Sequence, residues 1–148
     1  MNFFHILVVT AEEEIYRGKV SKVIACSSSG ELGIMAGHAP LLAILRPGVL
    51  RLDCRGEQRD EANTCLEVIV LGGYLEVQPN NVIVLADAVE RAEDLNRAKA
   101  EKAVQRAKDN FALAKGGNID LAMVALELAL ARYNLVCKND GINLNRRS

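Results

Sequence analysis

The hydrophobic pattern of this chain changes abruptly at Asp87, and this change constrains the fold more than any other feature. Before Asp87, short apolar or alternating runs follow one another closely, with Gly, Pro, Ser, Asn or acidic residues between them. Such runs are typical of strands in an antiparallel sandwich or barrel. After Asp87, glycine and proline are absent until Gly116, and apolar residues recur at helical spacing. We therefore expect a β + α fold, in which an N-terminal antiparallel β-sandwich or barrel precedes a C-terminal antiparallel two-helix hairpin.

Two helices are predicted beyond the break. The first, of about 22 residues, carries an alanine-rich stripe and ends at Gly116-Gly117. Asn118 is expected to cap a second helix, which ends near Cys137. This second helix is apolar on more than one side, so the first helix covers one side and the sandwich or a partner covers the other. The expected domains are a β-sandwich at 1–87, a helical hairpin at 88–138 and a mobile tail at 139–148.

Composition and charge exclude several classes of function. The chain has 148 residues, of which 50% are hydrophobic, so it can bury a core. Its net charge of −1 gives no basic surface for the phosphate backbone, so we expect no nucleic-acid partner. No apolar run is long enough to span a bilayer, so we expect no direct membrane insertion, and the N-terminus lacks the pattern of a signal peptide.

The four cysteines form no C-x-x-C pair, so neither a zinc site nor a redox motif is indicated. Cys54 and Cys65 flank the polar link 55–64 and could face each other across two strands. A cytosolic setting would keep that pair reduced. We therefore expect four reduced, structural thiols.

Two stretches in the β region carry strong turn signals. The stretch 30–48 reads as strand, glycine-rich bend and strand, with Gly37 free to adopt positive φ and Pro40 restricting the chain just after the bend. The stretch 72–87 reads as a β-hairpin that turns at Pro79-Asn80-Asn81. Rigid exposed bends of this kind usually serve recognition.

Catalytic and metal-binding patterns are missing from the sequence. It contains no nucleophile elbow, no His-x-x-x-His and no Walker A motif. Its two histidines lie in different kinds of element, His5 on an alternating strand and His38 in the bend. We therefore expect a protein that is not an enzyme.

Four segments together resemble the epsilon subunit of bacterial F-type ATP synthases, which corresponds to the delta subunit of the mitochondrial enzyme. They are GELGIMAGHAPLL at 30–42, RPGVLR at 46–51, GGYLEVQPNNVIVLAD at 72–87 and RAEDL at 91–95. Their order and spacing agree across most of the chain. The resemblance implies a β-sandwich followed by a helical hairpin, with its boundary at the break that the hydrophobic pattern also indicates.

The resemblance also implies the partners. The sandwich is expected to grip the gamma subunit of the central stalk and to rest on the ring of membrane c subunits. Glu31 and His38 are the residues expected to dock onto the c ring, although His38 could equally be satisfied within its own loop. The C-terminal helices are expected to reach the alpha/beta catalytic head and to block ATP hydrolysis there.

Some members of this family bind regulatory ATP through the motif I/L-D-x-x-R-A. The aligned residues here begin at Leu95 and end at Ala100, with Asn96 and Lys99 in place of the aspartate and the arginine. The loss of a carboxylate and of a planar guanidinium weakens this motif. We therefore expect no cofactor, and regulatory ATP is the less favoured alternative. Ala36 also departs from the family, where proline is common in the bend.

The expected function is that of a non-catalytic rotor subunit, which couples rotation of the c ring and gamma to ATP synthesis and uses its helices as a possible inhibitor of hydrolysis. Its expected place is the cytoplasmic side of the bacterial inner membrane, where it is bound peripherally. The alternative is a free-standing adaptor that binds proteins through its sandwich and helical hairpin. That alternative fits the apolar second helix but leaves the bend and the hairpin unexplained.

Overall fold

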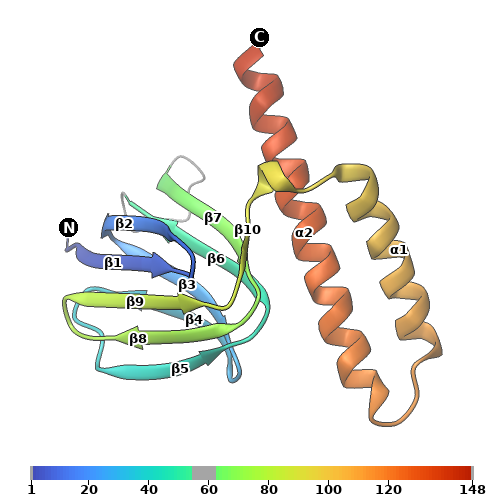
Figure 1. The fold of residues 1–148 in the computed structure, drawn as a ribbon, viewed down its shortest axis with the longest axis horizontal. Helices are drawn as coiled ribbons and strands as arrows, with labels where there is room; N and C mark the ends of the chain where they lie inside the picture. The colour runs from blue at the N-terminus through green and yellow to red at the C-terminus, as the bar shows by residue number, and fades with distance from the viewer. Residues whose placement is uncertain (1, 55–62, 148) are drawn as a thin grey trace. The chain divides into compact units, whose positions relative to one another are not determined.

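The computed structural model describes residues 2–54 and 63–147, with the backbone alone described for 142–147. The chain divides into two compact units, Met1–Glu90 and Arg91–Ser148 (Figure 1). The first unit is a β structure and the second is a pair of helices, as the change of pattern at Asp87 predicts. Residues 55–62 of the polar link lie outside the described residues.

The first unit is built from ten strands in one continuous sheet that folds over itself. The strands are β1 (Phe4–Val9), β2 (Glu14–Val20), β3 (Lys22–Ser27), β4 (Gly30–Met35), β5 (Leu41–Leu45), β6 (Gly48–Asp53), β7 (Thr64–Val70), β8 (Gly73–Val77), β9 (Asn81–Ala86) and β10 (Val89–Glu90). Their order in the sheet is β10-β7-β6-β3-β5-β8-β9-β1-β2, and β4 pairs with β3. The predicted bend thus joins β4 to β5, and the predicted hairpin is β8–β9.

The sheet forms two layers that meet at a narrow join between β3 and β5. Only one ladder pair, Ser27 with Leu45, connects these two strands over the described residues. All strand pairs are antiparallel except β1 and β9, which run parallel from the pair His5–Asn81 to the pair Val9–Leu85. The antiparallel β-sandwich predicted from the sequence is confirmed, with this one parallel pair as an addition.

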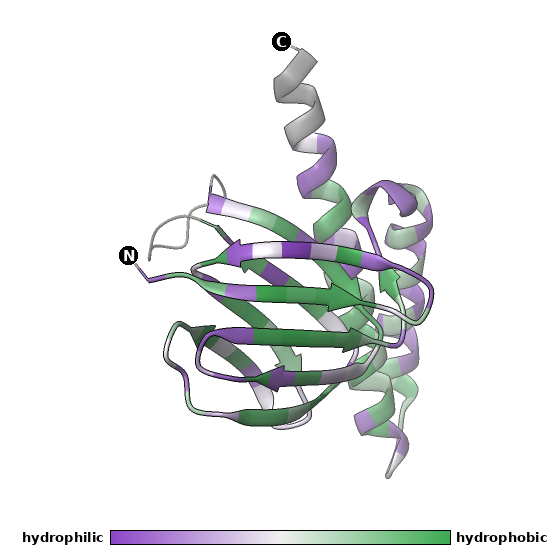
Figure 2. Cartoon of the chain, turned by 60° about the vertical axis from the view of Figure 1, so that its left-hand side comes forward, coloured by the Kyte–Doolittle hydropathy of each residue, from purple (hydrophilic) through white to green (hydrophobic). Residues whose placement is uncertain are grey.

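The core lies between the two layers and is formed by alternate residues of the strands. In β8, for example, Gly73, Leu75 and Val77 are buried while Tyr74 and Glu76 are exposed. Since successive side chains of a strand point to opposite faces, this alternation places one apolar face inward. The core residues are Phe4, Ile6, Val8, Val20, Val23, Ala25, Ile34, Leu45, Leu50, Leu52, Val68, Val70, Leu75, Val77, Val82, Val84 and Ala86. Figure 2 shows the matching run of hydrophobic colour along the strands.

One end of the sandwich gathers several segments that are distant in sequence. The ladder pairs Met35 with Lys22, Lys22 with Asp53, and Asp53 with Thr64, so these four residues lie in one row across β4, β3, β6 and β7. The bend after β4 and the turn 78–81 lie at this same end, because the Gly37 amide donates to the Pro79 carbonyl at 3.2 Å. We call this region, comprising 35–40, 53–54, 63–65 and 78–81, the His38 end.

The second unit contains a 3-10 turn, η2 (Ala92–Asp94), and two helices, α1 (Arg97–Leu113) and α2 (Asn118–Arg147). Helix α1 is shorter than expected and starts later, because the Asn96 side chain accepts a hydrogen bond from the Lys99 amide at 3.1 Å and caps the helix at that point. Helix α2 begins at the expected Asn118 but continues to Arg147, across most of the expected tail. No proline follows Pro79, and Gly141 alone costs a helix only about 1 kcal/mol.

The two helices pack through small side chains. Val104 and Ala107 of α1 form a buried cluster with Ala129 of α2, and Leu126 and Tyr133 pack against it. Short side chains let the helix backbones approach closely. The alanine stripe predicted for the first helix therefore forms the expected contact with the second helix.

Candidate functional site

The bend at the His38 end is a tight turn with defined hydrogen bonds. The His38 amide donates to the Met35 carbonyl at 3.2 Å, and Gly37, at the third position, has a φ of +80°. These are the features of a type II turn, in which only glycine or asparagine fits the third position readily. Ala36 occupies the second position, where proline is favoured, so its departure from the family pattern is compatible with the turn.

His38 is partly satisfied by its own loop. Its Nδ1 lies 2.7 Å from the Ala39 carbonyl oxygen. A carbonyl can only accept, so Nδ1 must carry the hydrogen, and the neutral ring therefore has an accepting Nε2. The side chain is half-buried at this position. The local hydrogen bond fixes the tautomer and leaves Nε2 as the atom with which His38 could bind a partner.

Glu31 lies elsewhere along the same strand. It is exposed near the start of β4, opposite Cys26, whereas His38 follows the end of that strand. Met35 lies four positions after Glu31, which corresponds to about 13 Å of extended chain. The structure therefore does not bring Glu31 and His38 into one cluster, and a surface that used both would have to run along β4.

Exposed apolar side chains gather on the outer side of β5, β8 and β9. Ile44 pairs with Tyr74, and Tyr74 pairs with Leu85, so the three side chains form a row across the strands. Their exposures are 58%, 51% and 51%, and Leu42 on β5 is 71% exposed. We call these four residues the outer apolar face. Contiguous exposed apolar side chains on a sheet are typical of a surface that contacts another protein.

The residues aligned with the ATP motif lie around the start of α1 and have separate local roles. Asn96 caps the helix, Lys99 is exposed and supplies the capped amide, and Ala100 is buried. The Leu95 amide donates to the Ala92 carbonyl at 3.1 Å, which closes the turn η2. Each of these hydrogen bonds is local to the start of α1.

Arg97, within the same segment, interacts with α2. A hydrogen bond with the Tyr133 side chain is the main cause that raises the pKa of the Arg97 guanidinium above its ordinary value, and Cys137 adds to the shift. Arg97 of α1 thus interacts with Tyr133 of α2. Nothing in the sequence pattern had singled it out.

Helix α2 also exposes large apolar side chains. Leu121 is 71% exposed and Met123 is 46% exposed, and the group continues with Val124 and Leu130. None of these residues belongs to the cluster that Val104, Ala107 and Ala129 form between the helices. The sequence had predicted a helix that is apolar on more than one side, and α2 has this character over its described side chains.

Metal-binding clusters do not occur among the described side chains. No three His, Cys, Asp or Glu residues come together there in a way that could hold a metal ion. A hollow of about 510 Å³ lies over β1, β2 and β9, and the ionisable side chains in its lining are His5 and Arg17, without a nucleophile or a carboxylate. Over the residues that the structure describes, neither α1 nor α2 has the length of uncharged apolar sequence that a membrane crossing needs.

Comparisons with known proteins decide the family. Residues 3–92 match the model of the ATP synthase delta/epsilon chain β-sandwich domain. The ATP synthase epsilon chain of Legionella pneumophila (strain Corby) is 46% identical over 127 residues, which cover 86% of each chain. The epsilon chain of Herminiimonas arsenicoxydans is 45% identical over 124 residues, which cover 84% of each chain.

This chain belongs to the ATP synthase delta/epsilon family. A chain in the structure of the Euglena gracilis mitochondrial ATP synthase, OSCP/F1/c-ring in rotational state 1, matches it with a TM-score of 0.64 at 20% identity. That match covers 87% of this chain and 78% of the other, and it shows that the fold is shared. Epsilon chains are non-catalytic subunits of the ATP synthase, so the family confirms the expectation of a protein that is not an enzyme.

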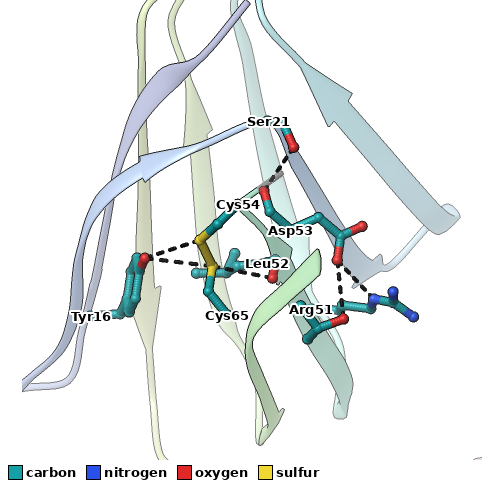
Figure 3. The surroundings of a disulfide bond; sticks show 8 residues. Tyr16, Ser21, Arg51, Leu52, Asp53, Cys54 and Cys65 are labelled. Atoms are coloured by element: carbon teal, nitrogen blue, oxygen red, sulfur yellow. Dashed lines mark hydrogen bonds and ion pairs between the residues drawn. A yellow bond between two sulfur atoms is a disulfide. The ribbon is translucent and has the colours of Figure 1, made fainter. Parts of the chain in front are cut away.

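The expectation for the cysteines was wrong for one pair. Cys54 and Cys65 form a disulfide with Cα atoms 5.7 Å apart (Figure 3), whereas Cys26 and Cys137 are not disulfide-bonded. The pairing has a structural cause in the register of β6 and β7, which shifts between Leu52 and Asp53. Cys65 lies between the partners of these two residues, and Cys54 directly follows Asp53. The sequence did contain a signal for this pair, since the two cysteines flank one link between predicted strands.

A buried ion pair beside this disulfide was also missed. Arg51 Nε lies 2.9 Å from Asp53 Oδ1, with side-chain exposures of 13% and 4%. The Thr64 hydroxyl donates to the same Asp53 oxygen at 3.3 Å, and the Ser21 hydroxyl donates to the Asp53 carbonyl at 2.9 Å. This network ties the junction of β2 and β3 to β6 and β7 at the His38 end, as Figure 3 shows.

Proposed function

We propose that this chain is the epsilon-type rotor subunit of an F-type ATP synthase, in which it couples rotation of the c ring and gamma to ATP synthesis. Membership of the delta/epsilon family and the epsilon-chain relatives support this proposal. The relatives come from bacteria, so the corresponding place is the cytoplasmic side of the bacterial inner membrane, with peripheral attachment through partner subunits.

The outer apolar face is the single observation that carries the binding part of the proposal. Four large exposed apolar side chains on one sheet face would lower the solubility of a free-standing domain. Burial of apolar area yields about 25 cal/mol per Å², so covering this row would stabilise an interface by several kcal/mol. We assign this face to the gamma subunit, and the His38 end, with His38 Nε2, to the polar loops of the c ring.

Charge placed on the outer apolar face should disrupt assembly. We expect Ile44→Glu to reduce recovery of gamma with the tagged chain from native membranes by about tenfold or more, because a buried carboxylate without a partner costs several kcal/mol. Ala11→Glu, at an exposed position of the β1–β2 turn, is the matched control and should leave recovery unchanged. Full recovery of gamma with Ile44→Glu would reject this face as the docking surface.

The second part of the proposal concerns the helices. We assign α2 a second packing surface in the alpha/beta head, where it would restrain ATP hydrolysis. The exposed apolar residues of α2, among them Leu121 and Met123, favour this role because they suit burial against another protein. Most of the stability of a helix comes from what it packs against, so two alternative surfaces make a switch possible. The free-standing adaptor is not favoured, because the family model matches the sandwich itself.

A further inference from the structure

The two residues of the disulfide at the His38 end differ in exposure. Cys65, the second residue of β7, is exposed, whereas Cys54, which follows β6, is half-buried. An attacking thiolate must reach a sulfur in line with the S–S bond, so access decides which sulfur it attacks. The geometry therefore directs a thiol from solution to Cys65 and makes Cys54 the leaving group.

Tyr16 on β2 supports this direction of attack. Its hydroxyl lies 3.3 Å from Cys54 Sγ and 3.5 Å from Cys65 Sγ (Figure 3). A disulfide sulfur carries no hydrogen, so Tyr16 must be the donor. A hydrogen bond to a sulfur grows stronger as that sulfur gains negative charge, so Tyr16 stabilises the departing Cys54 thiolate. The tyrosine thus acts as a positioning residue for exchange.

We propose that Cys54 and Cys65 form a reversible thiol–disulfide exchange site whose co-reactants are dithiols and their disulfides, and that its redox state sets the rigidity of the His38 end. The exchange and the change in rigidity are properties of the chain itself. The consequence for docking, a change in how the His38 end binds a partner, rests on the function proposed above.

The reduction proceeds in two balanced steps. One thiolate of the dithiol attacks Cys65 Sγ, a mixed disulfide forms, and Cys54 leaves as a thiolate that takes up a proton. The second thiolate of the reductant then attacks the reductant sulfur that is bonded to Cys65. Cys65 is released as a thiolate that takes up a proton, and the reductant becomes a cyclic disulfide. Two electrons pass to the protein, and the reverse sequence uses the same pair of reactants. The released Cys65 thiol has an acceptor ready, since its Sγ lies 3.4 Å from the Leu52 carbonyl oxygen.

The disulfide is connected to the bend by a short path. Cys54 directly follows Asp53, and Asp53 pairs with Lys22. Lys22 in turn pairs with Met35, the residue at which the His38 turn begins. A crosslink over a sequence separation of 11 restricts the ends of β6 and β7. When the crosslink opens, local opening at this end becomes easier, and the turn that holds His38 loses part of its support.

Differential alkylation of the full-length protein tests whether the pair exchanges. Free thiols of the air-exposed native protein are blocked first, then excess dithiothreitol is added without denaturant and newly exposed thiols are labelled. We expect Cys54 and Cys65 alone to carry the second label in mass spectra. Labelling of all four cysteines in the first step would show that no disulfide is present, and absence of the second label would show that the disulfide does not exchange; either result would overturn the proposal.

Substitution of the tyrosine tests the proposed route of attack. Tyr16→Phe keeps the ring and removes the hydroxyl, and we expect reduction by dithiothreitol to become about tenfold slower, the equivalent of one hydrogen bond to a charged group. Tyr74→Phe, on the outer apolar face, is the matched control and should keep the original rate. An equal rate for Tyr16→Phe would show that the hydroxyl plays no part in exchange.

Amide hydrogen exchange tests the link to the bend. We expect the Gly37 and His38 amides, which donate to Pro79 and Met35, to exchange about tenfold faster in the reduced chain, while the Val104 amide in α1 is unchanged. Cys65→Ser should reproduce the reduced pattern, and Cys26→Ser should reproduce the oxidised one. Identical exchange in the two redox states would overturn the link, and because the isolated chain is measured, this result would leave the proposed rotor function untouched.

Discussion

Gly73 and Gly37 both have positive φ, at +129° and +80°, but their surroundings differ. A Cβ on Gly73 would overlap the carbonyl oxygen of Leu85 on the paired strand, whereas nothing lies within 4 Å of a Cβ on Gly37. Glycine is therefore required at position 73 both by the backbone conformation and by the close approach of the strands. At Gly37 it is required only by the backbone conformation of the turn.

Alanine substitutions should separate these two roles. We expect Gly37→Ala to lower the free energy of unfolding by about 1–2 kcal/mol, the cost of a left-handed backbone conformation for a residue with a Cβ. Gly73→Ala should lower it by about 4 kcal/mol or more, because the strand pair must also move apart. Urea denaturation of the two full-length variants measures the difference. Equal losses would contradict the packing described between β8 and β9.

Asn96, at the start of α1, can be interpreted as a changed residue of the ATP motif or as a helix cap. Asn96 replaces the aspartate of the family's ATP motif, yet it caps α1 as an aspartate would. Its identity is therefore explained by the helix, without ATP. Because the capping role of Asn96 was not recognised, the first helix was expected to be longer than α1 is.

Restoration of the motif should strengthen nucleotide binding. We expect the double variant Asn96→Asp, Lys99→Arg to bind ATP about tenfold or more tightly than the unchanged chain, because a carboxylate and a guanidinium restore charge-assisted hydrogen bonds. Isothermal titration calorimetry on the full-length chains makes the comparison. Asn96→Ala is the control, since it removes the cap at a cost of about 1 kcal/mol and should gain no affinity. No gain in the double variant would mean that this segment does not take part in ATP binding.

At the scale of elements, local signals predicted most of the β structure. The glycine-rich bend and the hairpin turn at Pro79 were recognisable because turn chemistry lies within a few neighbouring residues. The parallel pairing of β1 with β9 was not, because periodicity gives the faces of a strand but not its neighbour in the sheet. The end of α2 was also missed, since a polar composition after Cys137 suggested a tail and a helix can continue through polar residues.

The candidate sites were less predictable than the fold. Glu31 and His38 were named from the resemblance, and the structure separates them along β4. The outer apolar face emerged only from the register, which places Ile44, Tyr74 and Leu85 in one row. Because such a row combines residues of three strands, no single segment of the sequence could indicate it.

At the scale of the whole molecule, the two units can be separated experimentally. The sandwich unit ends at Glu90, where β10 pairs with β7, and the helices follow. We expect a chain truncated after Glu90 to assemble into the ATP synthase and to raise its rate of ATP hydrolysis, because the element assigned to inhibition is gone. Hydrolysis by purified complexes with full-length and truncated chains provides the comparison. An unchanged rate in a fully assembled truncated complex would exclude the inhibitory role.

The central claim, that this chain turns with the rotor, can be observed directly. A probe is attached through Glu13→Cys, at the exposed β1–β2 turn, in a chain that also carries Cys26→Ser and Cys137→Ser, and the assembled ATP synthase is fixed to a surface through its catalytic head. When ATP is added, we predict that the probe rotates in one direction together with gamma. A probe that remains stationary while gamma rotates in the same complexes would contradict the account.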